Sequence, residues 1–153
     1  MTRRLLRWAV PALAVLAAVY VLVYADLVLR ARSAYLEGEK YMLWQERPEE
    51  KKAFYEAEFS REKAGLDREK AEGRLSENEY SQRLELERFR ADEAVAESSL
   101  KYAYHWYKTA VELFSPPESR WVRLSRSRMG EAKELWKAEL RAKKIPFEEY
   151  MLE

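Results

Sequence analysis

Few residues in this sequence could do chemistry. The chain has one histidine, His105, and no cysteine. No carboxylate stands at the spacing that would place a metal-ligand set or an acid-base pair with His105 on one helix face, so a packed or surface histidine is expected. Carboxylate pairs such as Glu49/Glu50 and Glu85/Glu87 lie in charge-rich segments and are explained by solvated helix faces. Phosphate-binding glycine loops and nucleophile motifs are missing from the sequence. We therefore expect no enzymatic activity, no cofactor, no metal site and no small-molecule substrate.

The composition predicts the kind of fold that holds these residues. Of 153 residues, 36% are charged, and there are only 4 glycines and 5 prolines. This composition is typical of helical proteins, and the length allows one domain rather than two. We expect an all-α chain in which a single N-terminal transmembrane helix precedes a small domain of helical hairpins.

The most distinctive segment lies at the N-terminus. Trp8 to Ala25 is a run of 18 residues without a charge, and Leu27, Val28 and Leu29 extend it past Asp26. A helix of about 20 apolar residues spans the ~30 Å hydrocarbon core of a bilayer. The sequence therefore predicts a membrane anchor within residues 1–30, with lipid contacts from residues 5–29.

The residues that flank this segment indicate its orientation. Arg3, Arg4 and Arg7 precede it without an acidic residue, which favours a cytoplasmic N-terminus. We expect a single-pass protein of the inner membrane whose C-terminal domain is periplasmic. An alternative stays open, because the residues up to Ala25 are tolerated at a signal-peptide cleavage site. The chain would then be a secreted helical protein cleaved after Ala25.

Turn signals divide the rest of the chain into helices. Pro48, followed by two glutamates, starts a helix that is expected to reach about residue 72. Gly73 can end that helix, and Ser76 forms a capping box with Glu79, so a helical hairpin is predicted. Residues 73–80 resemble the turn of short helical-hairpin domains of the SHOCT type, which implies a structural hairpin without chemistry.

Two further boundaries are expected nearer the C-terminus. The apolar stripe changes face within residues 77–114, which predicts a bend or break near Ser98 and Ser99. Ser115 as N-cap, with Pro116 in the first helical position, predicts the start of the last helix. Ile145 and Pro146 are expected to end it.

A second resemblance rests on residues 103–116. Ala103, Tyr107, Ala110 and Val111, with Pro116 downstream, have nearly the spacing of the second helix of a tetratricopeptide repeat. This segment resembles that helix, with the proline one residue late. The resemblance implies a helical module for protein-protein interaction, not catalysis.

Two other segments extend this resemblance. Gly38 and Tyr41 resemble the glycine and aromatic residue of a repeat's first helix. Trp121 and Leu124, followed by Ser125 in place of glycine, resemble the start of the next repeat. In this comparison, residues 47–97 separate the two helices of the first repeat. The resemblance therefore implies that this segment is a hairpin inserted into the repeat. Residues 37–97 are acidic, with 12 basic and 18 acidic side chains.

The candidate contact residues begin with an aromatic cluster. Tyr102, Tyr104, Trp106 and Tyr107 point to nearly every side of one helix, so some are expected to face a partner or another copy of the chain. Two neighbouring helices of the same chain are an equally good explanation for how they are covered.

A basic stripe follows in residues 120–144, which hold nine basic and three acidic side chains. Trp121 and Trp136 lie along its apolar side, whereas Arg123 and Arg126 lie along the basic side. This basic side is solvated, paired with the acidic hairpin, or bound to anionic headgroups or an acidic partner.

The tail, residues 146–153, is too short to fold alone. Its Phe147 and Tyr150 are candidates for anchoring in a groove of this chain or of a partner.

These features predict an anchor at 1–30 and an extracytoplasmic domain at 31–153. The domain contains the hairpin 47–97, a tetratricopeptide-like helical pair at 98–145 and the tail. The predicted function is a non-enzymatic scaffold or assembly subunit of a membrane-associated complex, which binds protein partners or itself and no nucleic acid. An alternative is a peripheral binder of anionic membrane surfaces that uses the basic helix 120–144. The residues predicted to bind a partner are Tyr102, Tyr104, Trp106, Tyr107, Trp121, Arg123, Arg126, Trp136, Phe147 and Tyr150.

Overall fold

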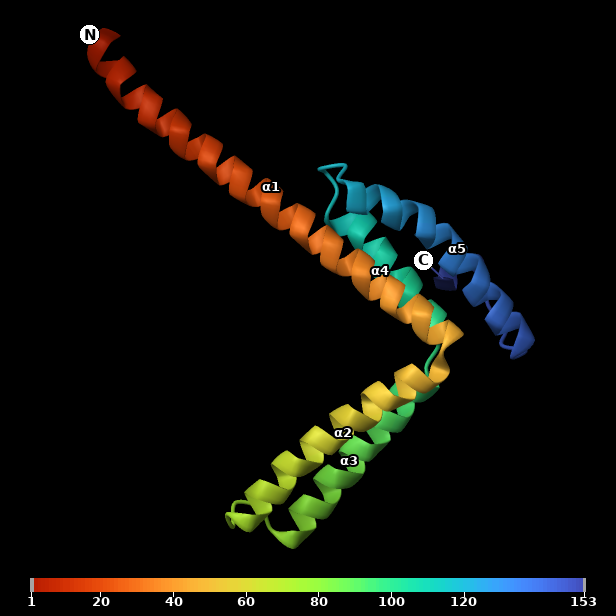
Figure 1. Ribbon diagram of the computed structural model, residues 1–153. Helices are drawn as coiled ribbons and strands as arrows, with labels where there is room; N and C mark the ends of the chain where they lie inside the picture. The colour runs from red at the N-terminus through yellow and green to blue at the C-terminus, as the bar shows by residue number, and fades with distance from the viewer. Residues whose placement is uncertain (1, 153) are drawn as a thin grey trace. The chain divides into compact units, whose positions relative to one another are not determined.

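The computed structural model describes the backbone of residues 2–152 and the side chains of residues 11–152. Within that part of the chain there is no strand (Figure 1). The elements are α1 (Thr2–Glu46), α2 (Pro48–Ala71), α3 (Glu77–Ala96), α4 (Ser99–Leu113), α5 (Arg120–Ala142) and the 3-10 helix η1 (Glu149–Leu152). The predicted all-α fold is confirmed. The predictions for the side chains of Arg3, Arg4, Arg7 and Trp8 lie outside the described residues.

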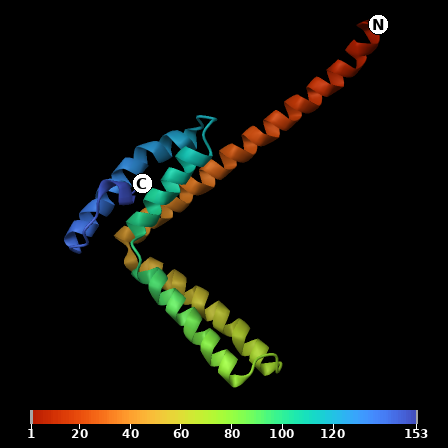
Figure 2. The ribbon, with the colours of Figure 1, turned by 180° about the vertical axis from the view of Figure 1, so that it is seen from behind.

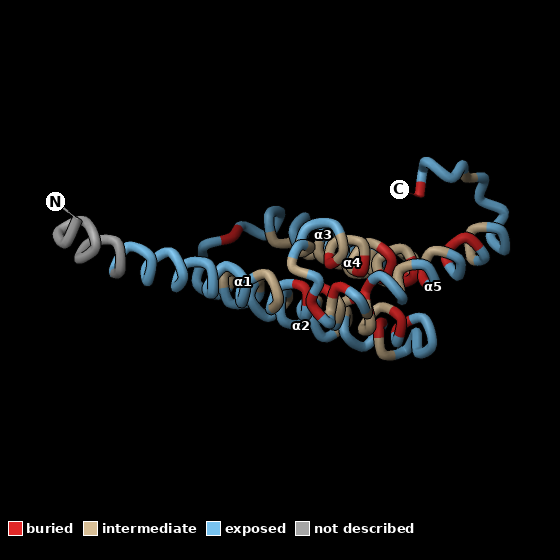
Figure 3. The backbone as a smooth tube through the Cα atoms, turned by 90° about the horizontal axis from the view of Figure 1, so that it is seen from above, coloured by how far each residue is buried: buried red, intermediate tan, exposed pale blue. Residues whose placement is uncertain are grey.

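α1 runs without interruption from the apolar segment, residues 8–29, into the rest of the protein. Its 45 residues make a helix of about 67 Å, roughly twice the thickness of a bilayer core. From Pro11 to Asp26 every side chain is exposed, whereas Ala31, Ala34 and Gly38 are buried (Figure 3). In the described chain, the part of α1 from Pro11 is long and apolar enough to cross a membrane.

The chain divides into two compact units. Met1–Lys40 and Leu100–Glu153 form the first, here called the anchor unit, and Tyr41–Ser99 form the second, called the hairpin unit. The segment 47–97, which was expected to be an insertion, lies inside the hairpin unit. Tyr41, which the tetratricopeptide resemblance places in the same repeat helix as Gly38, belongs to the hairpin unit as well.

The core of the anchor unit lies where α1, α4 and α5 meet. α4 packs beside the second half of α1 and runs in the opposite direction (Figures 1 and 2). The residues that α1 contributes are small, which lets the helix axes approach closely. The buried residues of this core include Ala31, Ala34 and Gly38 on α1, Leu100, Ala103, Tyr104, Tyr107 and Ala110 on α4, and Val122, Ser125, Ala132 and Trp136 on α5.

The start of α5 differs from the prediction. Ser115 does not cap the helix; residues 114–119 form a loop, and Ser119 is the N-cap, accepting a hydrogen bond from the Val122 amide at 3.3 Å. The reason is local, since each residue that precedes a proline is disfavoured in the helical region. Pro116 is followed by Pro117 and therefore cannot begin a helix. α5 also ends at Ala142, before the predicted Ile145.

The helix boundaries of the hairpin unit lie where the sequence predicts them. α2 begins at Pro48, Gly73 has a positive φ of 72°, and Ser76 and Glu79 form the predicted capping box. The break expected near Ser98 is present, because α3 ends at Ala96 and α4 begins at Ser99. These predictions are confirmed, and they depend on backbone geometry that a few residues determine.

Candidate functional site

Gly38 of α1 lies directly against the ring of Tyr107 of α4. A Cβ atom on Gly38 would lie 2.7 Å from Cδ1 and 2.8 Å from Cζ of the Tyr107 ring. Tyr107 is fully buried, and its ring centroid is 5.9 Å from that of Tyr35. Only glycine leaves room for the ring at this position, so the two helices are held in one register.

A carboxylate on α1 links the same tyrosine to α5. The Tyr107 hydroxyl donates a hydrogen bond of 2.6 Å to Oε1 of Glu39, and Nε of Arg128 donates one of 2.9 Å to the same oxygen. Nη1 of Arg128 also reaches Glu131 at 2.6 Å. The network therefore ties the three helices of the anchor unit together.

The protonation of this network follows from its surroundings. Burial opposes ionisation of Glu39, but the hydrogen bonds from Arg128 and Tyr107 outweigh it and lower the pKa of the carboxyl group. Burial and the Glu39 carboxylate raise the pKa of the Tyr107 hydroxyl. The hydrogen bond to Glu39 raises the pKa of Arg128, against the effect of burial. Glu39 is thus a carboxylate near neutral pH, paired with a charged guanidinium.

Three of the predicted contact residues belong to the protein's own core. Tyr104, Tyr107 and Trp136 are buried within the anchor unit, and the rings of Tyr104 and Trp136 lie 6.0 Å apart. For Tyr104 and Tyr107 this burial agrees with the alternative explanation, that neighbouring helices of the same chain cover them. The helical pattern cannot distinguish the two, because it does not show how many helices surround α4.

Two aromatic residues of the same cluster remain partly open. Tyr102 and Trp106 are half-buried. Trp106 and Phe114 line one side of a groove of about 330 Å³. Residues of α1, among them Asp26, Leu29 and Arg30, line the other side. This groove lies where the apolar segment ends.

The basic stripe of α5 is largely paired within the anchor unit. Arg126 makes two hydrogen bonds to the Glu118 carboxylate, at 2.7 and 3.0 Å, and Arg123 donates to the Glu118 carbonyl at 2.9 Å. Both arginines are nevertheless exposed. Trp121 is half-buried, with its ring centroid 5.6 Å from that of Tyr35.

The tail packs back onto α5. Leu152 is buried, and Glu149 pairs with Lys137 at 2.8 Å. Phe147 is half-buried with the Arg141 guanidinium 5.8 Å from its ring centroid, whereas Tyr150 is 69% exposed. Of the two aromatic anchors predicted in the tail, Tyr150 is the one left open.

His105 is part of the packing around Trp136. Its ring centroid lies 5.9 Å from that of Trp136 and 5.3 Å from that of Tyr104. Burial lowers the pKa of the imidazole, and Lys101 and Lys108 add to the effect. This histidine is therefore neutral near pH 7. In the described part of the chain no group of three or more histidine, cysteine, aspartate or glutamate side chains is arranged to hold a metal ion.

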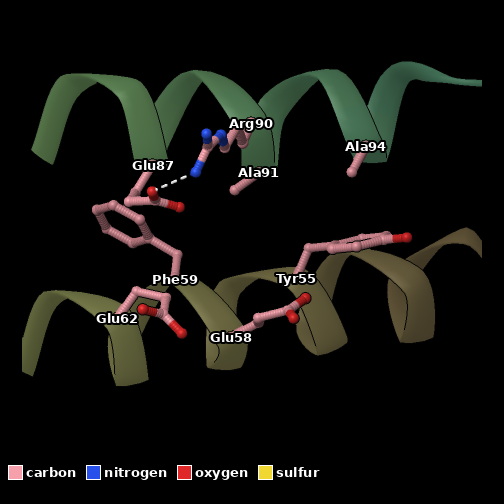
Figure 4. Close-up of a pocket in the computed structure, with 8 residues that line it drawn as sticks. All are labelled: Tyr55, Glu58, Phe59, Glu62, Glu87, Arg90, Ala91 and Ala94. Carbon is pink, nitrogen blue, oxygen red and sulfur yellow. Dashed lines mark hydrogen bonds and ion pairs between the residues drawn. The ribbon is translucent and has the colours of Figure 1, made fainter. Parts of the chain in front are cut away.

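The hairpin unit contains a groove that sequence reasoning did not identify. It has a volume of about 440 Å³ and is lined by residues of α2 and α3 (Figure 4). Its apolar lining comes from Tyr55, Phe59, Ala91 and Ala94, and its acidic lining from Glu58, Glu62 and Glu87. Arg90, the one basic residue of the lining, pairs with Glu87 at 2.6 Å.

Ion pairs, more than buried apolar side chains, join the two helices of the hairpin unit. Arg88 of α3 makes two hydrogen bonds of 2.9 Å to Glu56 of α2. Within α2 and α3 no apolar side chain is buried, and Phe89 and Leu86 are 61% and 46% exposed. Few residues of 48–72 are apolar, which agrees with this open packing, but their pattern in the sequence does not indicate which residues line a groove.

No protein-family model matches the sequence, and comparisons with curated proteins and with solved structures find no significant match.

Proposed function

We propose that this protein is a membrane-anchored scaffold without enzymatic activity, whose hairpin unit binds a protein partner. The observation that carries the proposal is the open packing of α2 and α3. Apolar residues such as Phe59 and Phe89 lie between charged residues on α2 and α3, and no apolar residue within these two helices is buried. Exposed apolar surface rimmed by polar groups is characteristic of interaction sites.

The chemistry of the hairpin indicates the kind of partner. The unit has 11 basic and 16 acidic residues, and the groove itself is lined by three glutamates and one arginine. A partner segment with apolar side chains and flanking basic residues would complement both features.

The anchoring part of the proposal is supported by the continuity of α1. The helix that is long and apolar enough to cross a membrane is the same helix that packs against α4 and α5. An anchor of this kind holds the attached unit close to the membrane. The charges around the apolar segment favour a cytoplasmic N-terminus, so we place both units on the periplasmic side of the inner membrane.

We propose that the anchor unit is a tetratricopeptide-like module, and two features of its packing agree with that proposal. Gly38 lies against the Tyr107 ring, and the small residues Ala103 and Ala110 are buried against neighbouring helices. Modules of this kind bind proteins, which agrees with a scaffold. In this proposal α1 and α4 form one helix pair and α5 begins another. That is fewer than the three repeats an independent array needs, so the contacts among these three helices must supply the stability of the module.

The direction of α5 disfavours the alternative function, in which the basic helix 120–144 lies flat on an anionic membrane surface. Trp121 contacts Tyr35 and Arg128 contacts Glu39, so α5 runs alongside α1 in the same direction. If α1 crosses the bilayer, the axis of α5 extends away from the membrane surface instead of lying along it. At a rise of 1.5 Å per residue, the C-terminal end of α5 would lie roughly 30 Å further from the membrane than its first turn.

Co-purification from mildly solubilised membranes tests the scaffold proposal. Tagged full-length protein is compared with Leu86→Ser/Phe89→Ser, which removes exposed apolar surface from the hairpin. Leu135→Ser is the matched control, because Leu135 is also exposed but lies on α5. We expect a stoichiometric partner, or a second copy of the chain, that the hairpin variant loses and the control retains.

Two other outcomes would change the proposal. If Tyr102→Ala/Trp106→Ala loses the partner and the hairpin variant does not, the contact surface lies on α4 instead. If the wild-type protein is recovered alone and monomeric, the scaffold proposal is wrong.

A further inference from the structure

We propose that Leu113, the last residue of α4, and the loop that follows it, residues 114–119, form a second contact with the lipid bilayer beside the transmembrane helix. The inference rests on the proposed membrane anchoring by α1. It adds a lipid-binding site within the folded unit, at a place that the sequence pattern did not indicate.

The position of the loop along α1 is the first argument. Phe114 and Trp106 line one groove together with Asp26, Leu29 and Arg30. These three residues of α1 are the last of the apolar segment and the first beyond it. Because α4 is antiparallel to α1, its C-terminal end points towards the membrane, and the loop begins at the level where the hydrocarbon core would end (Figures 1 and 2).

The residues of the loop suit that environment. Leu113 is 68% exposed although it is fully apolar, and it stands next to Phe114. Pro116 and Pro117 follow and have no amide hydrogen, so this part of the backbone offers fewer donors that must be satisfied at a dehydrated surface. The exposed apolar side chain can thus enter the interfacial layer at low cost.

A cationic site lies at the same end of the anchor unit. The guanidinium groups of Arg32 and Arg120 lie 5.7 and 5.6 Å from the ring centroid of Trp121. In the described chain neither arginine forms an ion pair, whereas the nearby Asp26 is paired with Arg30 at 2.7 Å. Tryptophan favours the headgroup level of a membrane, and guanidinium groups bind phosphate through paired hydrogen bonds. We assign these two arginines to lipid phosphates.

The second contact would restrict how the anchor unit moves. A single transmembrane helix leaves the attached domain free to rotate about the helix axis. A loop that inserts at one side of that helix selects one rotation, so the same face of the unit always meets the membrane. A scaffold then presents its other surfaces to partners in a defined orientation.

The absence of cysteine makes the experiment direct. Full-length protein with Leu113→Cys is labelled with an environment-sensitive fluorophore and reconstituted in vesicles of phosphatidylcholine and phosphatidylglycerol. Lipids with a nitroxide near the headgroup or in the acyl chain then quench the label according to its depth. Leu135→Cys is the control for an exposed apolar position remote from the loop, and Ala17→Cys reports on the transmembrane segment.

We expect the label at position 113 to be quenched most by the headgroup-level nitroxide, and at least threefold more than the label at position 135. The label at position 17 should be quenched most by the acyl-chain nitroxide. If position 17 is quenched and position 113 is no more accessible to nitroxide lipids than position 135, the inference is wrong while membrane anchoring stands. If the label at position 17 is not quenched by either nitroxide lipid, the proposed membrane anchoring is wrong, and the second contact, which depends on it, is wrong as well.

Discussion

Replacing Gly38 by alanine is the most direct test of how the anchor unit is held together. The new Cβ would lie 2.7 to 2.8 Å from ring atoms of Tyr107, well inside van der Waals contact. The ring cannot turn away easily, because Tyr107 is fully buried and its hydroxyl is bonded to Glu39 at 2.6 Å. α1 and α4 must therefore separate, or the hydrogen bond must lengthen.

The expected magnitude is the difference between two effects. Overpacking of a well-packed core costs about 1–3 kcal/mol. Alanine in place of glycine within a helix contributes roughly 0.5–1 kcal/mol of stability in the opposite direction. The net result for Gly38→Ala is a loss of about 1 kcal/mol in the free energy of unfolding of the anchor unit, within a range of about 0–2.5 kcal/mol.

A second glycine provides the control. Gly130 lies in α5 of the same unit, and a Cβ there would meet nothing within 4 Å. Gly130→Ala should therefore keep only the favourable helix effect, and we expect it to stabilise the unit by about 0.5–1 kcal/mol. Both variants replace glycine by alanine, but we expect opposite signs for the change in the free energy of unfolding.

Amide hydrogen exchange of α4 in the full-length, detergent-solubilised protein measures this effect without interference from the hairpin unit. A loss of 1–2 kcal/mol corresponds to about 5- to 30-fold faster exchange of the slowest amides. If Gly38→Ala slows exchange as Gly130→Ala does, the close contact with Tyr107 does not restrict the two helices, and the argument from it fails.

Two further predictions concern the ion network and the hairpin. Glu39→Gln should lower the free energy of unfolding by about 1–2 kcal/mol at pH 7, because it removes the charge from the hydrogen bonds to this side chain. The folded protein lowers the pKa of Glu39 below its ordinary value of 4.5. The stabilisation by the carboxylate is therefore present above pH 4.5 and is lost as the pH falls through the folded pKa. The stabilities of the two proteins, measured by chemical unfolding, should thus differ above pH 4.5 and converge as the pH falls below it; a difference that does not shrink on acidification would contradict the assignment. Ser76→Ala should lower the stability of α3 by about 1 kcal/mol, because its hydroxyl accepts a hydrogen bond from the amide of Glu79. Ser81→Ala, at an exposed position inside the same helix, should not destabilise it; faster exchange of α3 in both variants would show that capping is not the cause.

Several elements of this protein could be predicted because they depend on short stretches of sequence. The apolar run ending near Leu29, the helix start at Pro48 and the capping box at Ser76 each need only a few neighbouring residues. The same local reasoning was wrong at Ser115, because it followed the serine-proline pattern and did not weigh the second proline, Pro117.

The surfaces available to partners were harder to predict. Tyr102, Tyr104 and Tyr107 are similar in the sequence, yet Tyr107 is fully buried and Tyr102 is half-exposed. What separates them is which side of α4 faces α1 and α5. Likewise, the groove of the hairpin unit depends on which residues of α2 and α3 come together.

The sequence by itself determined the helical class, the apolar segment and the hairpin turn, because composition, hydropathy and capping act over one or two helical turns. Only the tertiary structure decided that Gly38 must accommodate the ring of Tyr107, that Glu39 joins three helices through Tyr107 and Arg128, and that Leu113 stands exposed where the apolar segment ends. These contacts join residues far apart in the chain, and they depend on helix register and direction, which no local pattern encodes.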